Sequence, residues 1–273
     1  MKIPFTKMSG SGNDFIFIDH RKPILSEDEM KEFARKVCRR RVSVGADGLV
    51  LVERAEKADI KWRFFNSDGS EAEMCGNAGR CLARFSYLRG ITGPSLTFET
   101  LAGILSAQVN GRIVKLEMTK PNGLKLDETI ILGDRAQNIS GLNTGVPHAV
   151  VFVDDLGEID VIQKGREIRY HPHFSPQGTN ANFVRLRGPS RLEVRTYERG
   201  VEDETLACGT GVVASALVAA FKGFVTSPAS VKTTGGEVLT VHFELGAGEV
   251  RKVFFEGEVR IVYEGEMWEE AYQ

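Results

Sequence analysis

Two cysteines of the chain lie in the same local pattern. Cys75 and Cys208 are each followed by a glycine, and each begins a stretch with the apolar spacing of a helix. Free backbone N–H groups and the dipole at a helix N-terminus stabilise a thiolate, so they lower the pKa of a thiol from its reference value of about 8.5. The glycine lets a ligand approach the backbone closely. Each Cys-Gly pair therefore predicts a reactive thiol beside a turn that can hold an anionic group.

The two cysteines belong to an internal repeat. They are 133 residues apart, and the same offset relates five further pairs, namely Gly12 and Gly145, Gly45 and Gly178, Gly90 and Gly223, Thr100 and Thr233, and Gly103 and Gly236. A fixed offset along the whole chain indicates an ancient duplication. Two copies of one reactive helix start predict a thiol on each side of a single substrate. Such a pair removes a proton from one face of a carbon and returns one to the opposite face, so we expect racemisation or epimerisation.

The segments around the cysteines carry ordinary signals for strands and helices. Short β-rich runs cover residues 16–19, 49–53 and 60–66, and an Asn-Gly hairpin is expected at 109–112. Ser26 and Glu29 form a capping box ahead of an amphipathic helix whose apolar stripe includes Met30, Phe33, Ala34 and Val37. Two more helices are expected to run from Cys75 to Gly90 and from Cys208 to Gly223. The last of these is apolar nearly all round, which predicts burial on every side.

These elements predict an α/β protein of the α+β kind, with two pseudo-symmetric domains and the active site in the cleft between them. Strands are expected to wrap around one central helix in each half. The first domain spans residues 1–118 and carries Cys75, and the second spans 119–262 and carries Cys208. Residues 121–123 are the expected link, and we expect the tail, 263–273, to pack back on the first domain.

Composition narrows the class of protein. The 273 residues include 35 Lys and Arg against 37 Asp and Glu, with no basic block, so the chain lacks the charge pattern of a protein that binds nucleic acid or an anionic membrane. The longest apolar run, 212–221, is far shorter than the roughly 20 residues that span a bilayer, and the N-terminus does not resemble a signal peptide. We therefore expect a cytoplasmic protein with a small-molecule partner.

The remaining cysteines and the histidines have a simpler interpretation. Cys38 and Cys81 fall on apolar helix stripes, so we assign them to the core. The 4 cysteines contain no CxxC pair, which argues against a disulfide framework and a zinc site. His171 and His173 lack a supporting cluster of ligands, and no metal or cofactor is expected.

Several stretches resemble the bacterial diaminopimelate epimerase family, in order and across nearly the whole chain. They are SGSGNDFIFID, ADGLVLVE, FNSDGSEAEMCGNAGR, GVPHAVVFVDD, GTNANFV and RTYERGVEDETLACGTG. The resemblance implies two α/β domains around central helices, a homodimer, and interconversion of LL- and meso-2,6-diaminopimelate without pyridoxal phosphate or metal, in lysine and peptidoglycan synthesis. Related proline and hydroxyproline racemases typically place His after the first Cys-Gly, where this chain has Asn77.

The resemblance also implies roles for individual residues. Cys75 and Cys208 match the two acid/base thiols, and His148 and Glu198 match positions that tune them. The implied substrate-binding residues are Asn13, Asn66, Gly76, Asn77, Asn180, Glu198, Arg199, Gly209 and Thr210. Backbone N–H groups of both helix starts would take up the charge that develops on the substrate carboxylate.

Two positions depart from the family pattern, and other functions stay open at this point. Val146 replaces an Asn of many members, and Gly48 replaces a Gln of some, so one contact to the distal end of the substrate is lost or supplied from elsewhere. The first alternative is another cofactor-independent racemase of the same fold. The second is a non-catalytic ligand-binding module or a cysteine hydrolase, for which His148 would be the base.

Overall fold

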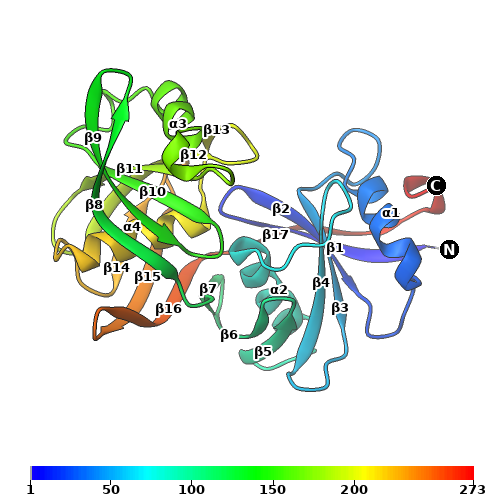
Figure 1. Cartoon of the computed structure of the whole chain (residues 1–273). Coiled ribbons are helices and arrows are strands. Elements are labelled where there is room, and N and C mark those ends of the chain that lie inside the picture. Colours follow the sequence, from blue (N-terminus) through cyan, green and yellow to red (C-terminus); the bar gives the residue numbers. More distant parts are fainter. Residues whose placement is uncertain (1) are drawn as a thin grey trace. The chain divides into compact units, whose positions relative to one another are not determined.

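A computed structural model describes residues 2–273, which form two units (Figure 1). The first unit extends to Glu117 and includes Gly257–Gln273, and the second is Met118–Glu256. The chain thus returns to the first unit at Gly257, several residues before the expected 263. The reason is local hydrogen bonding, because the N–H of Val259 already donates to the carbonyl of Arg112 at 2.9 Å.

The first unit consists of eight strands and two α-helices. Their bounds are β1 Ile3–Gly10, β2 Asn13–Asp19, α1 Glu27–Val37, β3 Gly48–Glu53, β4 Ile60–Asn66, α2 Gly76–Leu88, β5 Ser95–Thr100, β6 Gly103–Asn110, β7 Ile113–Glu117 and β17 Arg260–Met267. A short 3-10 helix, η2, follows at Glu269–Ala271. Strand β1 pairs antiparallel with β2 and β17, β2 pairs parallel with β3, and β3 pairs antiparallel with β4. Helix α2 packs against β1, β2, β3, β6 and β7.

The second unit repeats this plan. Its elements are β8 Asn122–Leu132, β9 Arg135–Asn143, β10 Pro147–Phe152, α3 Val161–Arg169, η1 Pro172–Phe174, β11 Asn180–Leu186, β12 Arg191–Glu198, β13 Asp203–Thr205, α4 Gly209–Phe221, β14 Ala229–Lys232, β15 Val238–Gly246 and β16 Glu249–Glu258. Strand β10 pairs antiparallel with β9 and parallel with β11, and β11 pairs antiparallel with β12. Helix α4 packs against strands on several sides, as β2, β3 and their neighbours pack around α2.

The local predictions for the first unit are confirmed. The Ser26–Glu29 capping box opens α1, where the backbone N–H of Ser26 donates to Glu29 Oε2 at 2.8 Å. The four stripe residues of this helix are buried. The hairpin at 109–112 is present, but Asn110 is still paired with Ile113, so the two turn residues are Gly111 and Arg112, one residue later than an Asn-Gly turn would place them.

Helices α2 and α4 show the duplication most clearly. Each has 13 residues, and Cys75 and Cys208 are their N-cap residues. Each also ends in a Schellman motif, with Gly90 at φ +65° and Gly223 at φ +74°. The N–H of Ile91 donates to the carbonyl of Ser86 at 2.8 Å, and the equivalent bond 133 residues later has the same length. The offset therefore holds at both ends of the two central helices.

The strands ahead of these helices match at an offset of 132. Leu49 opposes Phe65 in the first unit, and Ala181 opposes Tyr197 in the second. Both pairs lie in the core that covers the outer helix of their unit, α1 or α3. Because both pairs point into the core on the same side of the sheet, these strands are equivalent at an offset of 132 and not 133. At this offset, Glu198 is the counterpart of Asn66.

The core contains the two cysteines that we assigned to it. Cys38 is 3% exposed and Cys81 is fully buried. Burial raises the pKa of each thiol to about 12, so both stay protonated and unreactive at neutral pH. The rings of Phe17 and Phe85 stack at 5.4 Å and join β2 to α2.

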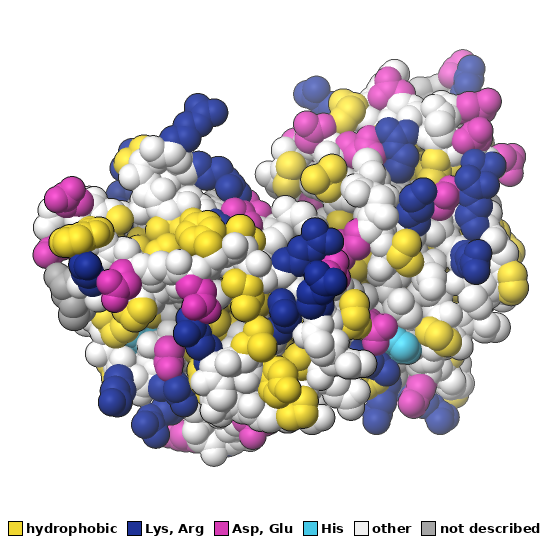
Figure 2. Space-filling view, turned by 180° about the vertical axis from the view of Figure 1, so that it is seen from behind, with side chains coloured by type: hydrophobic (Ala, Val, Ile, Leu, Met, Phe, Trp, Pro, Cys, Tyr) yellow, Lys and Arg dark blue, Asp and Glu magenta, His cyan; other side chains and the backbone are white. Residues whose placement is uncertain are grey.

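The nearly balanced numbers of acidic and basic residues can be seen on the surface (Figure 2). Acidic and basic side chains are interspersed over the face shown in Figure 2. Within residues 2–273, no helix is both long enough and apolar enough to cross a membrane.

The two Schellman glycines give a test of the duplication. We expect Gly90→Ala and Gly223→Ala each to lower the free energy of unfolding by about 1 kcal/mol, because the left-handed conformation is strained for alanine and nothing lies within 4 Å of either new methyl group. Urea denaturation measures the loss. Gly93→Ala is the control, since its backbone is ordinary and the nearest atom is 3.9 Å away. A loss in only one of the two variants would contradict equivalent helix ends.

Candidate active site

Cys208 occupies the N-cap of α4. Its backbone is extended, with φ −109° and ψ 106°, and its carbonyl accepts the first helical hydrogen bond from Val212 at 2.9 Å. The residue is 6% exposed, and Sγ lies 3.5 Å from Oγ1 of Thr210. The N–H groups of the first helical turn have no partner within the helix itself, so they can donate to an anion here.

A buried carboxyl group adjoins this thiol. Glu198 ends β12, and the side chains of Thr205 and Cys208 lie beside its carboxyl group. Burial raises the pKa of Glu198, and the contacts with Thr205 and Cys208 only partly oppose this rise. Glu198 therefore lies in hydrogen-bonding contact with the thiol of Cys208.

His148 lies on β10 and is 2% exposed. Its Nδ1 is 3.1 Å from Nδ2 of Asn182, which also donates to the carbonyl of Ala149 at 3.0 Å. Because that amide nitrogen is a donor, Nδ1 accepts and the proton of the neutral ring sits on Nε2. Burial and the positive charge of Arg199 lower the pKa of His148 to about 3, so the ring is neutral at physiological pH.

Asn182 connects the histidine to the helix start. Its Oδ1 accepts a hydrogen bond from Thr196 Oγ1 at 3.0 Å. A Cβ built at Gly211 would lie 2.3 Å from this Oδ1 and 3.3 Å from Sγ of Cys208, so only glycine allows the amide to approach so closely. Sequence analysis did not assign Asn182 a role, although it lies in the GTNANFV stretch that carries the family resemblance.

Asn180 acts through the neighbouring backbone. Its Oδ1 accepts from the N–H of Arg199 at 2.8 Å, and its Nδ2 donates to the carbonyl of Pro147 at 2.9 Å. The Arg199 side chain donates to the carbonyl of Gln177 at 3.0 Å. The structure thus brings Asn180 and Arg199 together. Both ends of the Asn180 amide are bonded to the backbone, and one of them holds the N–H of Arg199.

In the first unit, Cys75 is the N-cap of α2 and is partly exposed. Its carbonyl accepts the N–H of Gly79 at 2.9 Å, and Gly76 and Asn77 form the buried first turn. This is the same backbone arrangement as at Cys208. The thiol of Cys75 is more accessible than that of Cys208.

A directional chain of hydrogen bonds supports this helix start. Nη2 of Arg80 donates to Oδ1 of Asn77 at 2.8 Å, Nδ2 of Asn77 donates to Oδ1 of Asn13 at 2.8 Å, and Nδ2 of Asn13 donates to Asp47 at 3.0 Å. Arginine can only donate and an ionised carboxylate can only accept, so both amide orientations are fixed. Asn13 and Asn77 therefore form one unit, with Arg80 and Asp47, which sequence analysis missed, at its ends.

Asn66 is held separately, as the last residue of β4 at the start of the turn that follows. Its Nδ2 donates to Oγ of Ser70 at 3.0 Å, and the N–H of Ser67 donates to the carbonyl of Asp47 at 3.1 Å. The turn chemistry expected for Asn66–Gly69 is present. Asp47 thus contacts both the Asn13 side chain and the loop that carries Asn66.

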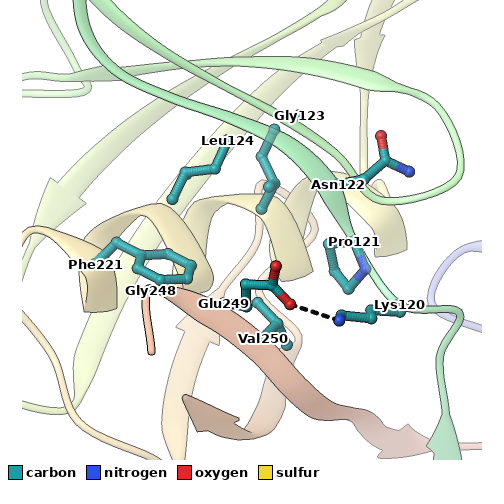
Figure 3. A pocket seen from close by; sticks show the side chains of 10 residues that line it. Lys120, Pro121, Asn122, Gly123, Leu124, Phe221, Gly248, Glu249 and Val250 are labelled. Atoms are coloured by element: carbon teal, nitrogen blue, oxygen red, sulfur yellow. Dashed lines mark hydrogen bonds and ion pairs between the residues drawn. The ribbon is translucent and has the colours of Figure 1, made fainter. Parts of the chain in front are cut away.

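A hollow of about 400 Å³ lies at the other end of α4 (Figure 3). It is lined by Lys120, Pro121, Asn122, Gly123, Leu124, Leu142, Phe221, Gly248, Glu249 and Val250. Lys120 and Glu249 form an ion pair of 2.8 Å at its rim. Phe221 is the last residue of α4, so the hollow is about 20 Å along the helix from Cys208 and is not part of the thiol site.

Comparison with solved structures identifies the fold. A hydroxyproline epimerase from Agrobacterium vitis matches with a TM-score of 0.72 and 16% identity, over 97% of this chain and 92% of that one. A PhzF-family phenazine biosynthesis protein from Bacillus anthracis matches with a TM-score of 0.69 and 19% identity, over 98% and 99% of the two chains. The fold, with its two central helices, is that of the proline racemase and PhzF type.

Sequence comparison defines the family. The family model described as diaminopimelate epimerase matches residues 5–123 and 141–260. A diaminopimelate epimerase of Aquifex aeolicus is 49% identical, over 98% of this chain and 99% of that protein, and one of Archaeoglobus fulgidus is 47% identical, over 86% and 88%. The chain belongs to the diaminopimelate epimerase family and is an isomerase.

The buried histidine predicts a pH dependence of stability. The unfolded chain binds a proton on His148 near its ordinary pKa of 6.5, whereas the folded chain binds it only near 3. The free energy of unfolding therefore falls as pH decreases through this window, by at most about 1.4 kcal/mol per pH unit from this group. Urea denaturation of wild type and His148→Gln between pH 4 and 7 measures the difference. His171→Gln is the control, and an unchanged slope in His148→Gln would contradict the prediction.

Proposed function

We propose that this chain interconverts LL- and meso-2,6-diaminopimelate, with Cys75 and Cys208 as the acid/base pair. One observation carries the proposal, namely that each unit of a diaminopimelate epimerase family member begins its central helix with a cysteine N-cap. No pyridoxal phosphate or metal takes part in the proposed reaction. The pathway that it serves is lysine biosynthesis, with peptidoglycan synthesis as a further use of the product.

The proposed reaction moves two protons. One cysteine, as thiolate, takes the α-hydrogen as a proton, and the electron pair of the broken C–H bond passes to the carboxylate-stabilised carbanion. The other cysteine, as thiol, gives its proton to the opposite face of the carbon. The charges of the two sulfurs are then exchanged, and the reverse reaction uses the opposite roles. An α-hydrogen is a far weaker acid than a thiol, so the carbanion must be stabilised electrostatically.

The helix starts supply that stabilisation in this proposal. The N–H groups of Gly76, Asn77, Gly209 and Thr210 belong to the first turns of α2 and α4, and they donate to the substrate carboxylate. These dipoles are fixed before the substrate arrives, so little reorganisation is needed when charge develops. Exclusion of water from the site would strengthen them further.

In this proposal, the remaining polar residues bind the substrate or adjust the proton affinity of the thiols. Glu198 adjusts the charge of Cys208, and His148 acts through Asn182. For the distal amino-acid end of the substrate, we assign Arg199 to a carboxylate and Glu198 to an ammonium group. Asn13, Asn66 and Asn180 complete this recognition, with Asn180 acting through the backbone of Arg199.

The two departures from the family pattern have different consequences. Val146 offers no hydrogen bond, so the contact of an Asn at this position is absent or is made by water. At Gly48 a Cβ would lie 2.6 Å from the ring of Phe64 and 2.7 Å from the carbonyl oxygen of Phe65. A glutamine there would require the β3–β4 pair to shift, so in this chain the corresponding contact is lost or is supplied from elsewhere.

We propose a cytoplasmic homodimer as the working form. Support for self-association comes from β17, on which Ile261, Val262 and Tyr263 expose 39%, 54% and 44% of their surfaces. Adjacent exposed apolar residues on a strand favour burial against a second copy. The interspersed charges give no reason to propose a nucleic acid as partner.

The decisive test uses purified protein with LL-diaminopimelate in D2O and thiol reductant, without added cofactor. We expect loss of the α-proton signal and formation of the meso isomer by NMR. Cys75→Ala and Cys208→Ala should each abolish epimerisation while the circular dichroism spectrum is unchanged, because either thiol alone serves one face of the carbon. Cys38→Ala is the matched control and should keep turnover. Full activity in either N-cap variant would exclude the two-base mechanism, and no deuterium exchange in wild type would exclude the proposed function.

The role of Glu198 predicts a feature of the pH profile. Burial raises the pKa of Glu198, so the acid limb of kcat/KM should lie above the pH at which an ordinary glutamate titrates. In Glu198→Gln we expect kcat/KM to fall by about 100-fold and this limb to disappear, because the side chain beside Cys208 no longer ionises. Glu193→Gln on the same strand should keep the wild-type profile. A wild-type limb in Glu198→Gln would assign it to another group.

A further inference from the structure

An arginine–glutamate pair occurs at matching places in the two units. Arg63 of β4 contacts Glu71 through two nitrogens, with Nη2 to Oε2 at 2.8 Å and Nε to Oε1 as the second contact. Arg195 of β12 contacts Glu204 in the same bidentate way, with Nε to Oε1 at 2.8 Å and Nη2 to Oε2 at 2.6 Å. The arginines match at the strand offset of 132, and the glutamates match at the helix offset of 133.

Each glutamate holds the segment that leads to a cysteine. Glu71 and Glu204 are both four residues before the N-cap cysteine of their unit. Their backbones also match, since Glu71 forms a bridge with Phe65 and Glu204 pairs with Tyr197. The glutamate therefore fixes both side chain and backbone to the sheet four residues before the N-cap cysteine of its unit.

Each arginine also reaches the start of the outer helix. Nη1 of Arg63 donates to the carboxylate of Glu27, the first residue of α1, at 2.9 Å. Nη1 of Arg195 donates to the carbonyls of Leu156 and Ile159 at 2.8 and 3.1 Å, just before the N-cap of α3. One guanidinium group thus joins the strand, the outer helix and the segment before the cysteine in each unit.

Both pairs are partly buried. The side chains of Arg63 and Glu71 are 12% and 19% exposed, and those of Arg195 and Glu204 are 28% and 16% exposed. Hydrogen bonds to the glutamates raise the pKa of both arginines. Burial opposes ionisation of Glu204, but hydrogen bonds from Arg195 and Thr234 outweigh it and lower the pKa. Bidentate pairs of this kind hold geometry better than exposed ion pairs do.

The two units have otherwise diverged in this region. Of residues 63–66 and 71–76, only Arg63, Glu71, Cys75 and Gly76 have the same residue type at the matching position of the other unit. Even Asn66, an implied substrate-binding residue, is matched by Glu198. The pair has thus persisted together with the Cys-Gly helix start and independently of the residues around it.

We propose that the two pairs, which we call the Arg–Glu clamps, are positioning residues for the thiols, and that each clamp acts on the cysteine of its own unit. The clamp fixes the entry of the chain into the central helix and thereby holds the thiol at the first-turn N–H groups. A loosened clamp lets the thiol leave these groups, so the thiolate loses their stabilisation. This inference concerns the thiols of the proposed function, but its test does not require turnover.

The test measures alkylation of each thiol by iodoacetamide in the intact chain, with mass spectrometry resolving the Cys75 and Cys208 peptides. In Glu71→Gln we expect the rate at Cys75 near pH 7 to fall by about tenfold, and its pH midpoint to rise, while Cys208 keeps its wild-type rate. Glu204→Gln should reverse the pattern. Glu193→Gln, which removes the exposed pair of 2.8 Å with Arg187, is the control and should change neither thiol.

The variants Arg63→Lys and Arg195→Lys distinguish the effect of the clamp's two-bond geometry from the effect of its positive charge. Lysine keeps the charge but cannot form the two parallel bonds, so we expect the same unit-specific pattern at smaller size. These variants also decide the matter if a glutamine variant does not fold, as judged by circular dichroism. Equal changes at both thiols, or no change in folded variants, would overturn the proposal. If the variants show the unit-specific pattern but wild type shows no epimerisation, the clamps stand and the proposed function fails.

Discussion

The structure depends on one constraint, namely that the first turn of a helix cannot satisfy its own N–H groups. In the outer helices, α1 and α3, side chains at the start of the helix itself form hydrogen bonds with these N–H groups or with the N-cap backbone. The capping box of Ser26 and Glu29 closes α1, and the carboxylate of Asp160 accepts the N–H of Gln163 at 3.0 Å in α3. Among the described residues, the N-cap cysteines of α2 and α4 accept no such capping bond with their side chains. The two central helices therefore differ from the outer ones in that no N-cap side chain closes their first turns.

The two helix starts have the same backbone arrangement but different electrostatic environments. At Cys75, the chain from Arg80 through Asn77 and Asn13 to Asp47 ends in full charges, so its amides are locked in one orientation. At Cys208, the neighbour is the carboxyl group of Glu198, whose pKa is raised, and the neutral imidazole of His148 is connected to the helix start only through Asn182. Such a difference suits a reaction in which one sulfur is a thiol while the other is a thiolate, because the two sites need not have the same proton affinity.

Sequence patterns predicted what depends on near neighbours along the chain. The capping box, the hairpin at Asn110, the helix starts and the terminal glycines all follow from spacings of a few residues, and the repeat follows from a fixed offset. Asp47, Arg80, Asn182 and the clamps were not found, because each bonds at least one residue from another element, which only the folded chain brings close. The slip from 133 to 132 was also invisible, since a one-residue change in register leaves the composition of a strand unchanged.

The state of His148 bears on the alternative of a cysteine hydrolase. That chemistry requires a histidine that takes the thiol proton and holds it as an imidazolium. A pKa of about 3 makes His148 a poor base at neutral pH, and its Nδ1 is already bonded to Asn182. The imidazole is thus suited to act as a fixed dipole and not as the base of a hydrolase. The carboxyl group beside Cys208 differs from it, because burial raises the pKa of Glu198 above that of an ordinary glutamate.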